Sequence, residues 1–429
     1  MKKHVGPAGT VLIIGAGGGV ARAVLALLSR TRLGRSLAAR IGELLLLDAE
    51  PVKGEILAGA RELMPARIRS APQLARVLDA YGVDQLVDLS SLDTVASARV
   101  CDAAGAAYLD TSIEHWPDAP PRPWLEQVRA ALPPARPALG RTSALVGSGM
   151  NPGIVNALVF AGMEELARRA GVAPDPAALA LHTVLVTEDD TTFEETLPPP
   201  GVFPMTWNPV LCLEELLLPE AIHAARGRIA GLGHAPAEAW YRARCGDRVI
   251  EGFVVPHEEV LTLAARLPDV ELGFVYRLPP AARMALAAAP ARRRPGDWRV
   301  HRMFPPHGTG QRGGDRVGVL LGSRRFGELW IGYDVDARAA APFGTNATQL
   351  QVAAGVIAGW AQLGRRRGIH FVEDLDWREH LAHVEAILGP PIVVHDPRAE
   401  PLSLPARRVA ARPQLELVRD RPAASLMPS

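Results

Sequence analysis

The chain has 429 residues, of which 48% are hydrophobic and 22% are charged, and its formal net charge is +1. This composition indicates a globular protein of two or three domains and gives no sign of a nucleic-acid or membrane partner. The three cysteines stand far apart, at no metal-binding spacing, and neither a signal peptide nor a membrane span is evident, so we expect a cytoplasmic protein without a bound metal. Lysine occurs only at Lys2, Lys3 and Lys53, which disfavours lysine-based covalent catalysis.

The first motif is a glycine cluster between an apolar run and a helical pattern. Val11–Ile14 predicts a buried parallel strand, and the cluster that follows consists of Gly15, Gly17, Gly18 and Gly19. A strand, a glycine turn and a helix in this order are typical of a dinucleotide site, where the backbone approaches a pyrophosphate and the helix N-terminus faces its charge. Because Val20 occupies the third glycine position of the fingerprint, an ordinary glycine turn without a ligand remains the alternative.

A second apolar run, Leu44–Leu47, ends at Asp48. A carboxylate at the tip of this strand accepts hydrogen bonds from the ribose hydroxyls of NAD and repels the additional phosphate of NADP. Residues 31–39 lengthen the usual spacing between the glycines and this acid. The pattern therefore predicts NAD as the cofactor.

Alternating patterns continue, with helices expected at 51–64, 72–81, 94–103 and 124–131, and strands near 66–70, 85–89, 107–109 and 143–146. They predict an α/β fold with a Rossmann-type parallel sheet as an NAD-binding domain over residues 1–150. Ligands of such sheets bind beyond the carboxyl ends of the strands. We therefore expect four polar residues at strand ends to meet the ligand: Ser90, Asp93, Asp110 and Glu114.

The pattern changes after a break at Met150–Gly153, which precedes an apolar helix expected over 154–167. Strand patterns at 180–187, 249–256, 270–276, 316–321 and 328–333 lie between proline-rich loops. They predict an α+β domain over 151–343, with a mixed, largely antiparallel sheet, for substrate binding and dimerisation. A helix rich in small residues is expected over 344–363 with Asn346 as its N-cap, in a helical return to the first domain over 344–398. Residues 399–429 are expected to form a mobile tail.

Acidic residues and a tryptophan cluster in the middle of the sequence. Glu188, Asp189 and Asp190 end an expected strand, where a solvated edge is the alternative interpretation. Trp207 lies in a proline-flanked loop shortly before Glu215, and a lone tryptophan in a loop is more often a packing residue. Together, however, carboxylates and an indole face can bind an alkylammonium through charge-assisted hydrogen bonds and cation–π attraction.

A histidine stands at an expected strand-to-helix junction, in the segment VVPHEEVLTLA. His257 is followed directly by Glu258 and Glu259. At such a junction a histidine acts either as a partner in helix capping or as a catalytic base, and the sequence does not decide between the two.

Several segments, in the same order, resemble the bacterial homospermidine synthase family, which is related to saccharopine and carboxynorspermidine dehydrogenases. The segments are GSGMNPGIV, TEDDTT, FPMTW, VVPHEEVLTLA, DRVGVLL and NATQLQVAAGVIAGW. The resemblance implies a tightly held NAD and a redox-neutral reaction. Putrescine is oxidised to an imine, ammonia is lost, the aldehyde condenses with a second amine, and the new imine is reduced to homospermidine.

The resemblance also implies roles for individual residues. Substrate-binding roles are implied for Glu188, Trp207, Glu215 and Asp315, and catalytic roles for His257, Glu114, Asn151 and Glu259. The cofactor is expected at the four glycines, Asp48 and Ser90. This chain lacks the family's acidic pair after a Tyr-His-Pro segment, since it reads YRLPPAA from Tyr276.

Two alternatives stay open. One is a reductase like the saccharopine group, which forms a secondary amine from a carbonyl compound and an amine or amino acid. The other is a non-catalytic NAD-binding protein. For the first reading we expect a homodimer that acts on a polyamine or a related small amine.

Overall fold

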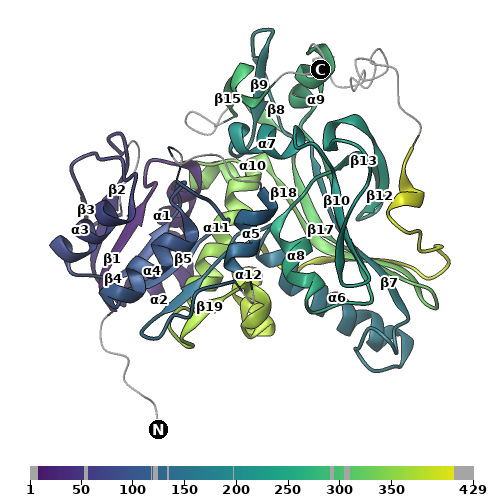
Figure 1. Cartoon of the computed structure of the whole chain (residues 1–429), viewed down its shortest axis with the longest axis horizontal. Coiled ribbons are helices and arrows are strands. Elements are labelled where there is room, and N and C mark those ends of the chain that lie inside the picture. Colours follow the sequence, from purple (N-terminus) through teal and green to yellow (C-terminus); the bar gives the residue numbers. More distant parts are fainter. Residues whose placement is uncertain are drawn as a thin grey trace.

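The computed structural model describes residues 8–52, 57–116, 118, 124–132, 135–196, 198–289, 294–303 and 310–409. Lys53 and residues 410–429 of the expected tail lie outside these ranges. The described residues form two sheets with helices around and between them, which confirms the predicted fold class (Figure 1). Within these ranges, no helix combines the length and the apolar composition that a membrane crossing requires.

The first sheet has seven parallel strands in the order β19–β6–β5–β4–β1–β2–β3, on the left of Figure 1. Its strands are β1 (Ala8–Ile14), β2 (Ile41–Leu47), β3 (Ala60–Glu62), β4 (Val83–Asp88), β5 (Ala107–Asp110), β6 (Ser143–Leu145) and β19 (Gly368–His370). Its helices are α1 (Gly19–Arg30), α2 (Arg32–Ala38), α3 (Ala71–Tyr81), α4 (Thr94–Ala104) and α5 (Trp124–Ala131). The order of β1 to β6 is that of a Rossmann sheet.

One expected helix of this half is wrong. In the described part of residues 51–64 the chain forms no helix, and residues 60–62 form the edge strand β3, which pairs in parallel with β2. Gly59, with a φ of +85°, interrupts any helical course there. The strand expected near 66–70 is a loop, held by a hydrogen bond from the Ala66 amide to the Asp48 carbonyl (2.9 Å).

The second sheet has nine strands and is mixed, because only β7 and β14 pair in parallel. Its strands are β7 (Leu181–Asp190), β10 (Ile222–Ala225), β11 (Arg228–Gly231), β12 (Tyr241–Cys245), β13 (Arg248–Val254), β14 (Glu271–Arg277), β17 (Gly314–Ser323), β18 (Gly327–Asp336) and β20 (Ile392–Asp396). Two short ribbons accompany it: β9 (Val202–Met205) with β15 (Arg299–Arg302), and β8 (Phe193–Glu194) with β16 (Gln311–Arg312). The remaining α-helices are α6 (Ile154–Ala170), α7 (Pro209–Leu216), α8 (Glu258–Ala264), α9 (Pro280–Ala288), α10 (Ala337–Ala340), α11 (Ala347–Trp360) and α12 (Trp377–Leu388).

Helix α11 joins the two sheets, since it contacts α1 and β5 on one side and β17 and β18 on the other (Figure 1). Asn346 is its N-cap, as predicted, and accepts a hydrogen bond from the Gln349 amide at 2.8 Å. The small residues of α11 allow a very close approach. A Cβ at Gly355 would lie 2.1 Å from the Gly149 carbonyl oxygen, so only glycine fits there.

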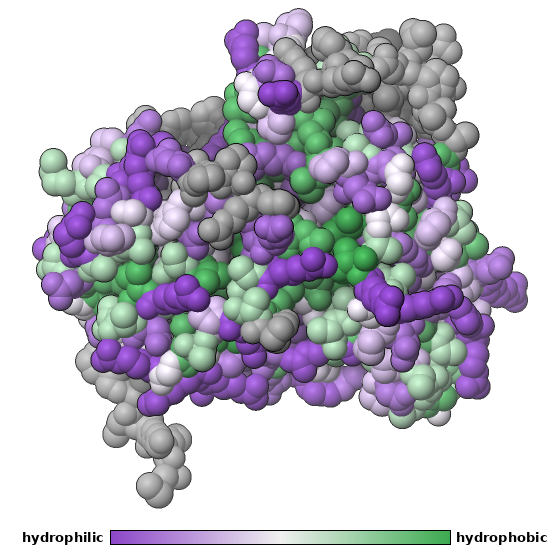
Figure 2. All heavy atoms as spheres, in the orientation of Figure 1, coloured by the Kyte–Doolittle hydropathy of each residue, from purple (hydrophilic) through white to green (hydrophobic). Residues whose placement is uncertain are grey.

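The first residues of the expected tail are packed against the second sheet. Leu404 is fully buried, and Arg407 donates to Glu328 Oε1 at 2.5 Å. Individual side chains such as Leu404 and Arg407 attach these residues to the sheet, rather than the apolar face of a regular helix or strand. This explains why the sequence shows little apolar periodicity here. In Figure 2 hydrophilic residues cover most of the visible face, while hydrophobic residues gather near its middle, where the two halves of the molecule meet.

Candidate active site

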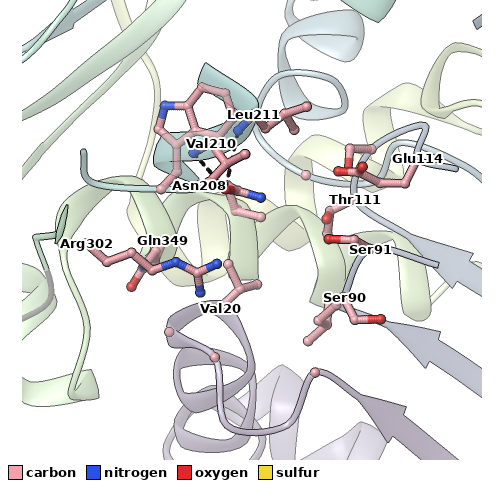
Figure 3. A pocket seen from close by; sticks show the side chains of 18 of the residues that line it. Val20, Ser90, Ser91, Thr111, Glu114, Asn208, Val210, Leu211, Arg302 and Gln349 are labelled. Carbon is pink, nitrogen blue, oxygen red and sulfur yellow. Dashed lines mark hydrogen bonds between the residues drawn. The ribbon is translucent and has the colours of Figure 1, made fainter. Parts of the chain in front are cut away.

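A cavity of about 950 Å³ lies between the carboxyl ends of the first sheet and the inner side of the second half. Twelve of the residues singled out from the sequence line it: Gly15, Gly17, Gly18, Gly19, Asp48, Ser90, Glu114, Asn151, Glu188, Trp207, Glu215 and His257. Figure 3 shows one part of the cavity, with the start of α1 below and Ser90, Ser91, Thr111 and Glu114 following the strands on the right. The expectation that ligands meet the carboxyl ends of the strands thus agrees with the position of the cavity.

The glycine turn connects β1 to α1. Gly15 has a φ of +78°, and a Cβ there would lie 2.3 Å from the Leu89 carbonyl oxygen, so a larger residue is excluded. The Gly17 amide donates to Asp48 Oδ2 at 2.9 Å, which fixes the Asp48 carboxylate beside the turn. No side chain caps α1 at Gly18, so the amides of its first turn face the cavity without a side-chain acceptor. These features fit a dinucleotide whose pyrophosphate lies at the turn and whose ribose lies at Asp48.

The three consecutive acids of β7 are divided between the two faces of the sheet. All are buried, with exposed fractions of 3% for Glu188 and 1% for both Asp189 and Asp190, which excludes the solvated edge. Because side chains alternate along a strand, Glu188 and Asp190 share one face and Asp189 takes the other. Asp189 forms ion pairs with Arg277 (3.3 Å) and Arg248 (3.6 Å), so it does not belong to the cavity.

Glu188 lies in the wall of the cavity. Its Oε2 accepts a hydrogen bond from Asn151 Nδ2 at 2.7 Å. Burial and then the charge of Asp190 raise its pKa to about 8, against the hydrogen bond from Asn151. Asp190 itself accepts hydrogen bonds from the Thr206 hydroxyl (2.7 Å) and the Thr192 amide (2.8 Å), and burial raises its pKa to about 6.

Trp207 and Glu215 lie on the same side of the cavity, before and within α7. Trp207 is half-buried, packs against the hydrophobic core and also lines the cavity, and its Nε1 donates to the Tyr276 hydroxyl at 3.3 Å. Glu215 is buried, and burial raises its pKa well above the usual range although His257 opposes this. The arrangement provides an indole face and a carboxyl group around one space.

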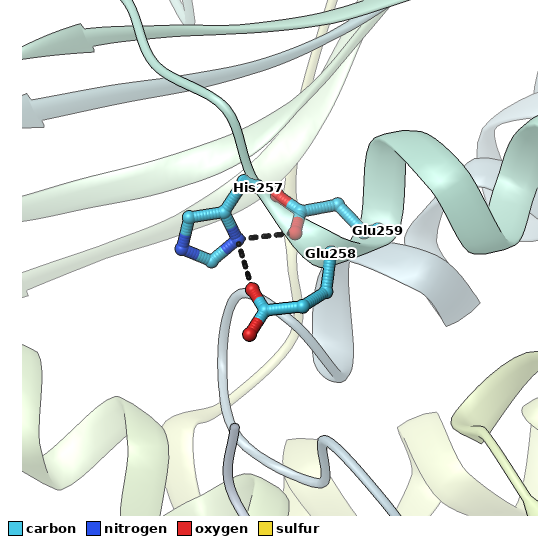
Figure 4. Close-up of side chains that lie close together, drawn as sticks. All are labelled: His257, Glu258 and Glu259. Atoms are coloured by element: carbon cyan, nitrogen blue, oxygen red, sulfur yellow. Dashed lines mark hydrogen bonds and ion pairs between the residues drawn. The ribbon is translucent and has the colours of Figure 1, made fainter. Parts of the chain in front are cut away.

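His257 stands at the N-cap position of α8, but its side chain makes no capping hydrogen bond. Its Nδ1 instead contacts Glu259 Oε2 in a short hydrogen bond and Glu258 Oε2 at 3.3 Å, as both dashed lines in Figure 4 show. Burial lowers its pKa, but the carboxylates of Glu259 and Glu258 outweigh this and raise the pKa well above its usual value. The imidazole is therefore held as a buried cation, and its Nε2 makes no hydrogen bond with any residue that the structure describes.

Those three side chains also have their ligating atoms within 4.8 Å of one another, close enough to bind a metal ion. However, both carboxylates converge on one ring nitrogen, which is the geometry of a shared N–H donor. A protonated imidazole satisfies both groups, and we assign no metal to them.

Glu114 extends from the loop after β5 into the cavity. Burial and then the charge of Glu258 raise its pKa to about 8. Glu258, which also lines the cavity, accepts a hydrogen bond from the Ile113 amide at 3.1 Å. The loop after β5 and the start of α8 are thereby joined, and their carboxyl groups face the same space.

In the described part of the chain, the carboxyl groups around Trp207 have no cationic partner other than His257. Within the described ranges, neither Glu114, Glu188, Glu215 nor Glu258 forms an ion pair with Arg or Lys. Buried carboxylates without a counter-charge are costly, so either they hold protons or a cation binds among them. The chamber is therefore suited to a ligand with ammonium groups.

Four predicted positions are placed differently. Asp315 is fully buried on β17 opposite Asp190, and it does not line the cavity. Glu259 is fully buried and contacts Nδ1 of His257, and it does not line the cavity. Asp93 caps α4 by accepting from the Ala96 amide (2.8 Å), and Asp110 accepts hydrogen bonds from Tyr108, Thr94 and the Gly147 amide. Asp93 and Asp110 were expected to meet the ligand; instead they hold the loops that do.

Glu258, Tyr276 and Arg302 also line the cavity, and the sequence alone indicates no role for them. Tyr276 lies on β14 directly beside Glu188 on β7. The two residues are far apart in the sequence, and only the pairing of the strands brings them together. Only the Glu258 position carried a local signal, since it adjoins His257 in the sequence.

No protein-family model and no curated protein sequence matches the chain. Among solved structures, the homospermidine synthase of Legionella pneumophila in complex with NAD matches with a TM-score of 0.76 and 18% identity, over 94% of this chain and 98% of that chain. An NAD binding oxidoreductase from Klebsiella pneumoniae matches 89% of each chain at 13% identity, with a TM-score of 0.33. The chain therefore has a homospermidine synthase-like fold, which confirms the resemblance at the level of the fold.

Proposed function

We propose that the protein is an NAD-dependent enzyme of the homospermidine synthase type, which transfers an aminobutyl group between polyamines. The observation that carries the proposal is the continuity of one cavity. At one end it has a dinucleotide-type glycine turn with Asp48, and at the other a chamber of buried carboxyl groups with Trp207. A cofactor at the first end and a diammonium at the second would share one cavity.

NAD as the cofactor is supported by the glycine turn, by Asp48 beside it, and by the shared fold with an enzyme crystallised with NAD. When bound, NAD would accept a hydride from the carbon that bears the amine and return it to the new imine. We propose no net consumption of NAD, because one oxidation and one reduction balance within a turnover.

The substrate in this proposal is a linear diamine such as putrescine. Glu188 and Glu215 would bind its ammonium groups through charge-assisted hydrogen bonds, which favour the ionised carboxylates and so lower their raised pKa values. Trp207 would place its indole face against the alkyl chain and ammonium group, a contact worth about 0.5–2 kcal/mol.

Proton transfers in this reaction require a group near the reacting carbon and nitrogen. The amine must lose a proton before oxidation, water must add to the imine before ammonia leaves, and the second amine must lose a proton before it condenses. His257, with Glu259 and Glu258 at Nδ1, could exchange these protons through its other nitrogen. Glu114, whose pKa of about 8 lies near neutrality, is a second candidate at the same cavity.

The test is incubation of the purified protein with putrescine and NAD, followed by mass spectrometry of the amines and by NADH absorbance. We expect homospermidine and released ammonia in equal amounts, with no steady change in NADH. NADH that is made or consumed in proportion to product would contradict the synthase reaction and would favour a dehydrogenase or a saccharopine-like reductase. The absence of any NAD binding would contradict the proposal altogether.

A further inference from the structure

One guanidinium reaches the cavity from the second half of the molecule. Arg302 is the last residue of β15 and lines the same cavity as Gly17, Gly18 and Val20. In Figure 3 its side chain points across the cavity toward the start of α1, where Val20 lies. Arg22 and Arg67 also line the cavity, but both belong to the first half.

Among the described residues, none holds the side chain of Arg302, whose backbone pairs with β9. Its neighbour on β15, His301, is held by Glu194 Oε2 at 2.7 Å. The Arg302 guanidinium, in contrast, makes no hydrogen bond or ion pair within the part of the chain that the structure describes, although carboxyl groups line the same cavity. An arginine that enters an acidic cavity and pairs with none of its acids is free to bind an anion there.

The backbone around Arg302 is fixed relative to the glycine turn. The Met303 carbonyl accepts a hydrogen bond from Asn346 Nδ2 at 3.0 Å, which holds the end of β15 to the N-terminus of α11. The adjacent Thr345 hydroxyl donates to the Gly19 carbonyl at 3.3 Å, which holds α11 to the first turn of α1. Two contacts thus connect β15 to the turn and fix the backbone from which the exposed Arg302 side chain extends.

We propose that Arg302 binds the pyrophosphate of the dinucleotide, an inference that rests on the proposed function. A pyrophosphate carries two negative charges, and the amides of the glycine turn offer only neutral donors on one side of it. A planar guanidinium on the opposite side supplies a charge and two parallel donors. It also separates the anionic cofactor from the carboxylates of the amine chamber. The dinucleotide would then contact both halves of the molecule.

The experiment measures ligand binding by calorimetry with the full-length protein freed of cofactor, for the wild type and three variants. The ligands are NAD, ADP-ribose, which keeps the pyrophosphate, and adenosine, which lacks it. Arg302→Gln removes the charge, and Arg302→Lys keeps it without the planar fork. Arg299→Gln is the matched control, since Arg299, like Arg302, is an exposed residue of β15 but does not line the cavity.

For Arg302→Gln we expect the Kd of NAD and of ADP-ribose to rise roughly 10- to 100-fold, with adenosine binding unchanged. Arg302→Lys should lose less, and Arg299→Gln should bind like the wild type. Equal losses for adenosine would indicate a general distortion and would overturn the assignment. So would unchanged NAD binding with a raised KM for the substrate, which would place Arg302 at the substrate instead. A wild type that binds no NAD would overturn the proposed function together with this inference.

Discussion

The side-chain amide of Asn151 donates to Oε2 of Glu188 across 2.7 Å and joins the loop after β6 to strand β7. The contact stabilises the ionised form of a carboxyl group that burial and Asp190 otherwise keep protonated near neutrality, with a pKa of about 8. The loop that contains Asn151 and the strand β7 therefore jointly control the charge of one proposed substrate anchor.

This control predicts the pH dependence of kcat/KM for a diamine substrate. A carboxyl group with a pKa of about 8 is mostly neutral at pH 6, and binding of an ammonium requires it to lose its proton. We therefore expect kcat/KM to rise with pH from 6 toward 8. Asn151→Ala removes a donor that lowers the pKa of Glu188, so the rise should move to higher pH. A flat profile between pH 6 and 8, measured by initial rates, would contradict the assignment of Glu188.

Glu215 and its neighbour Glu214 provide a matched pair of substitutions on α7. Glu215 is buried and lines the cavity, whereas Glu214 is exposed and does not line it. Glu215→Gln exchanges a charge-assisted hydrogen bond for a neutral one of roughly half the strength, so we expect KM to rise by about tenfold. Glu214→Gln should leave KM within about twofold. Similar KM values for the two variants in steady-state kinetics would remove Glu215 from the substrate site.

Trp207 is predicted to bind the substrate cation through its ring face. Trp207→Phe keeps a weaker quadrupole and Trp207→Ala removes it, so activity should fall in the order wild type, Phe, Ala. The amount of NAD bound to the purified protein should stay near the wild-type value, since the indole belongs to the amine chamber. If Trp207→Ala retains full activity, the indole does not bind the substrate. Its role would then be structural, through packing and the hydrogen bond to Tyr276.

Local patterns predicted much of the fold and part of the site. The glycine turn, the buried strands β1 and β2 and the Asn346 cap each depend on a few consecutive residues, so the sequence predicts them. Tyr276 and Arg302 could not be found in this way, because strand register and the path of β15 bring them to the cavity. The helix expected over 51–64 is wrong at residues 60–62, because their pairing with β2, which lies outside that segment, makes them a strand. The domain limits and the homodimer stay predictions.

Asp48 is predicted to select NAD over NADP. Its carboxylate, held by the Gly17 amide at 2.9 Å, can accept from a ribose hydroxyl and repels a phosphate in the same place. Asp48→Ala should weaken NAD binding by roughly tenfold and reduce the preference. Asp48→Asn keeps acceptors but not the charge, so it should improve NADP binding while costing less NAD affinity. Tighter binding of NADP than of NAD by the wild type, in calorimetric titrations, would contradict this role.

Asn346 is predicted to be a major stabilising residue, because one fully buried side chain satisfies three backbone groups. It caps α11 at the Gln349 amide (2.8 Å) and donates to the carbonyls of Thr206 (2.6 Å) and Met303 (3.0 Å). Gln349 Nε2 also donates to the Thr206 carbonyl (3.0 Å), so within the described ranges Asn346→Ala leaves the Met303 carbonyl without a hydrogen-bond donor.

The loss of the cap and the unpaired carbonyl should together lower the free energy of unfolding by about 2–4 kcal/mol. Asp376→Ala is the control, since Asp376 is an exposed N-cap of α12 and should cost only about 1 kcal/mol. Thermal unfolding followed by circular dichroism compares the two. Because Thr206 precedes Trp207 and Met303 follows Arg302, Asn346→Ala should also weaken NAD binding and raise KM for the amine. Equal shifts in the melting temperature of the two variants would show that Asn346 acts as an ordinary cap.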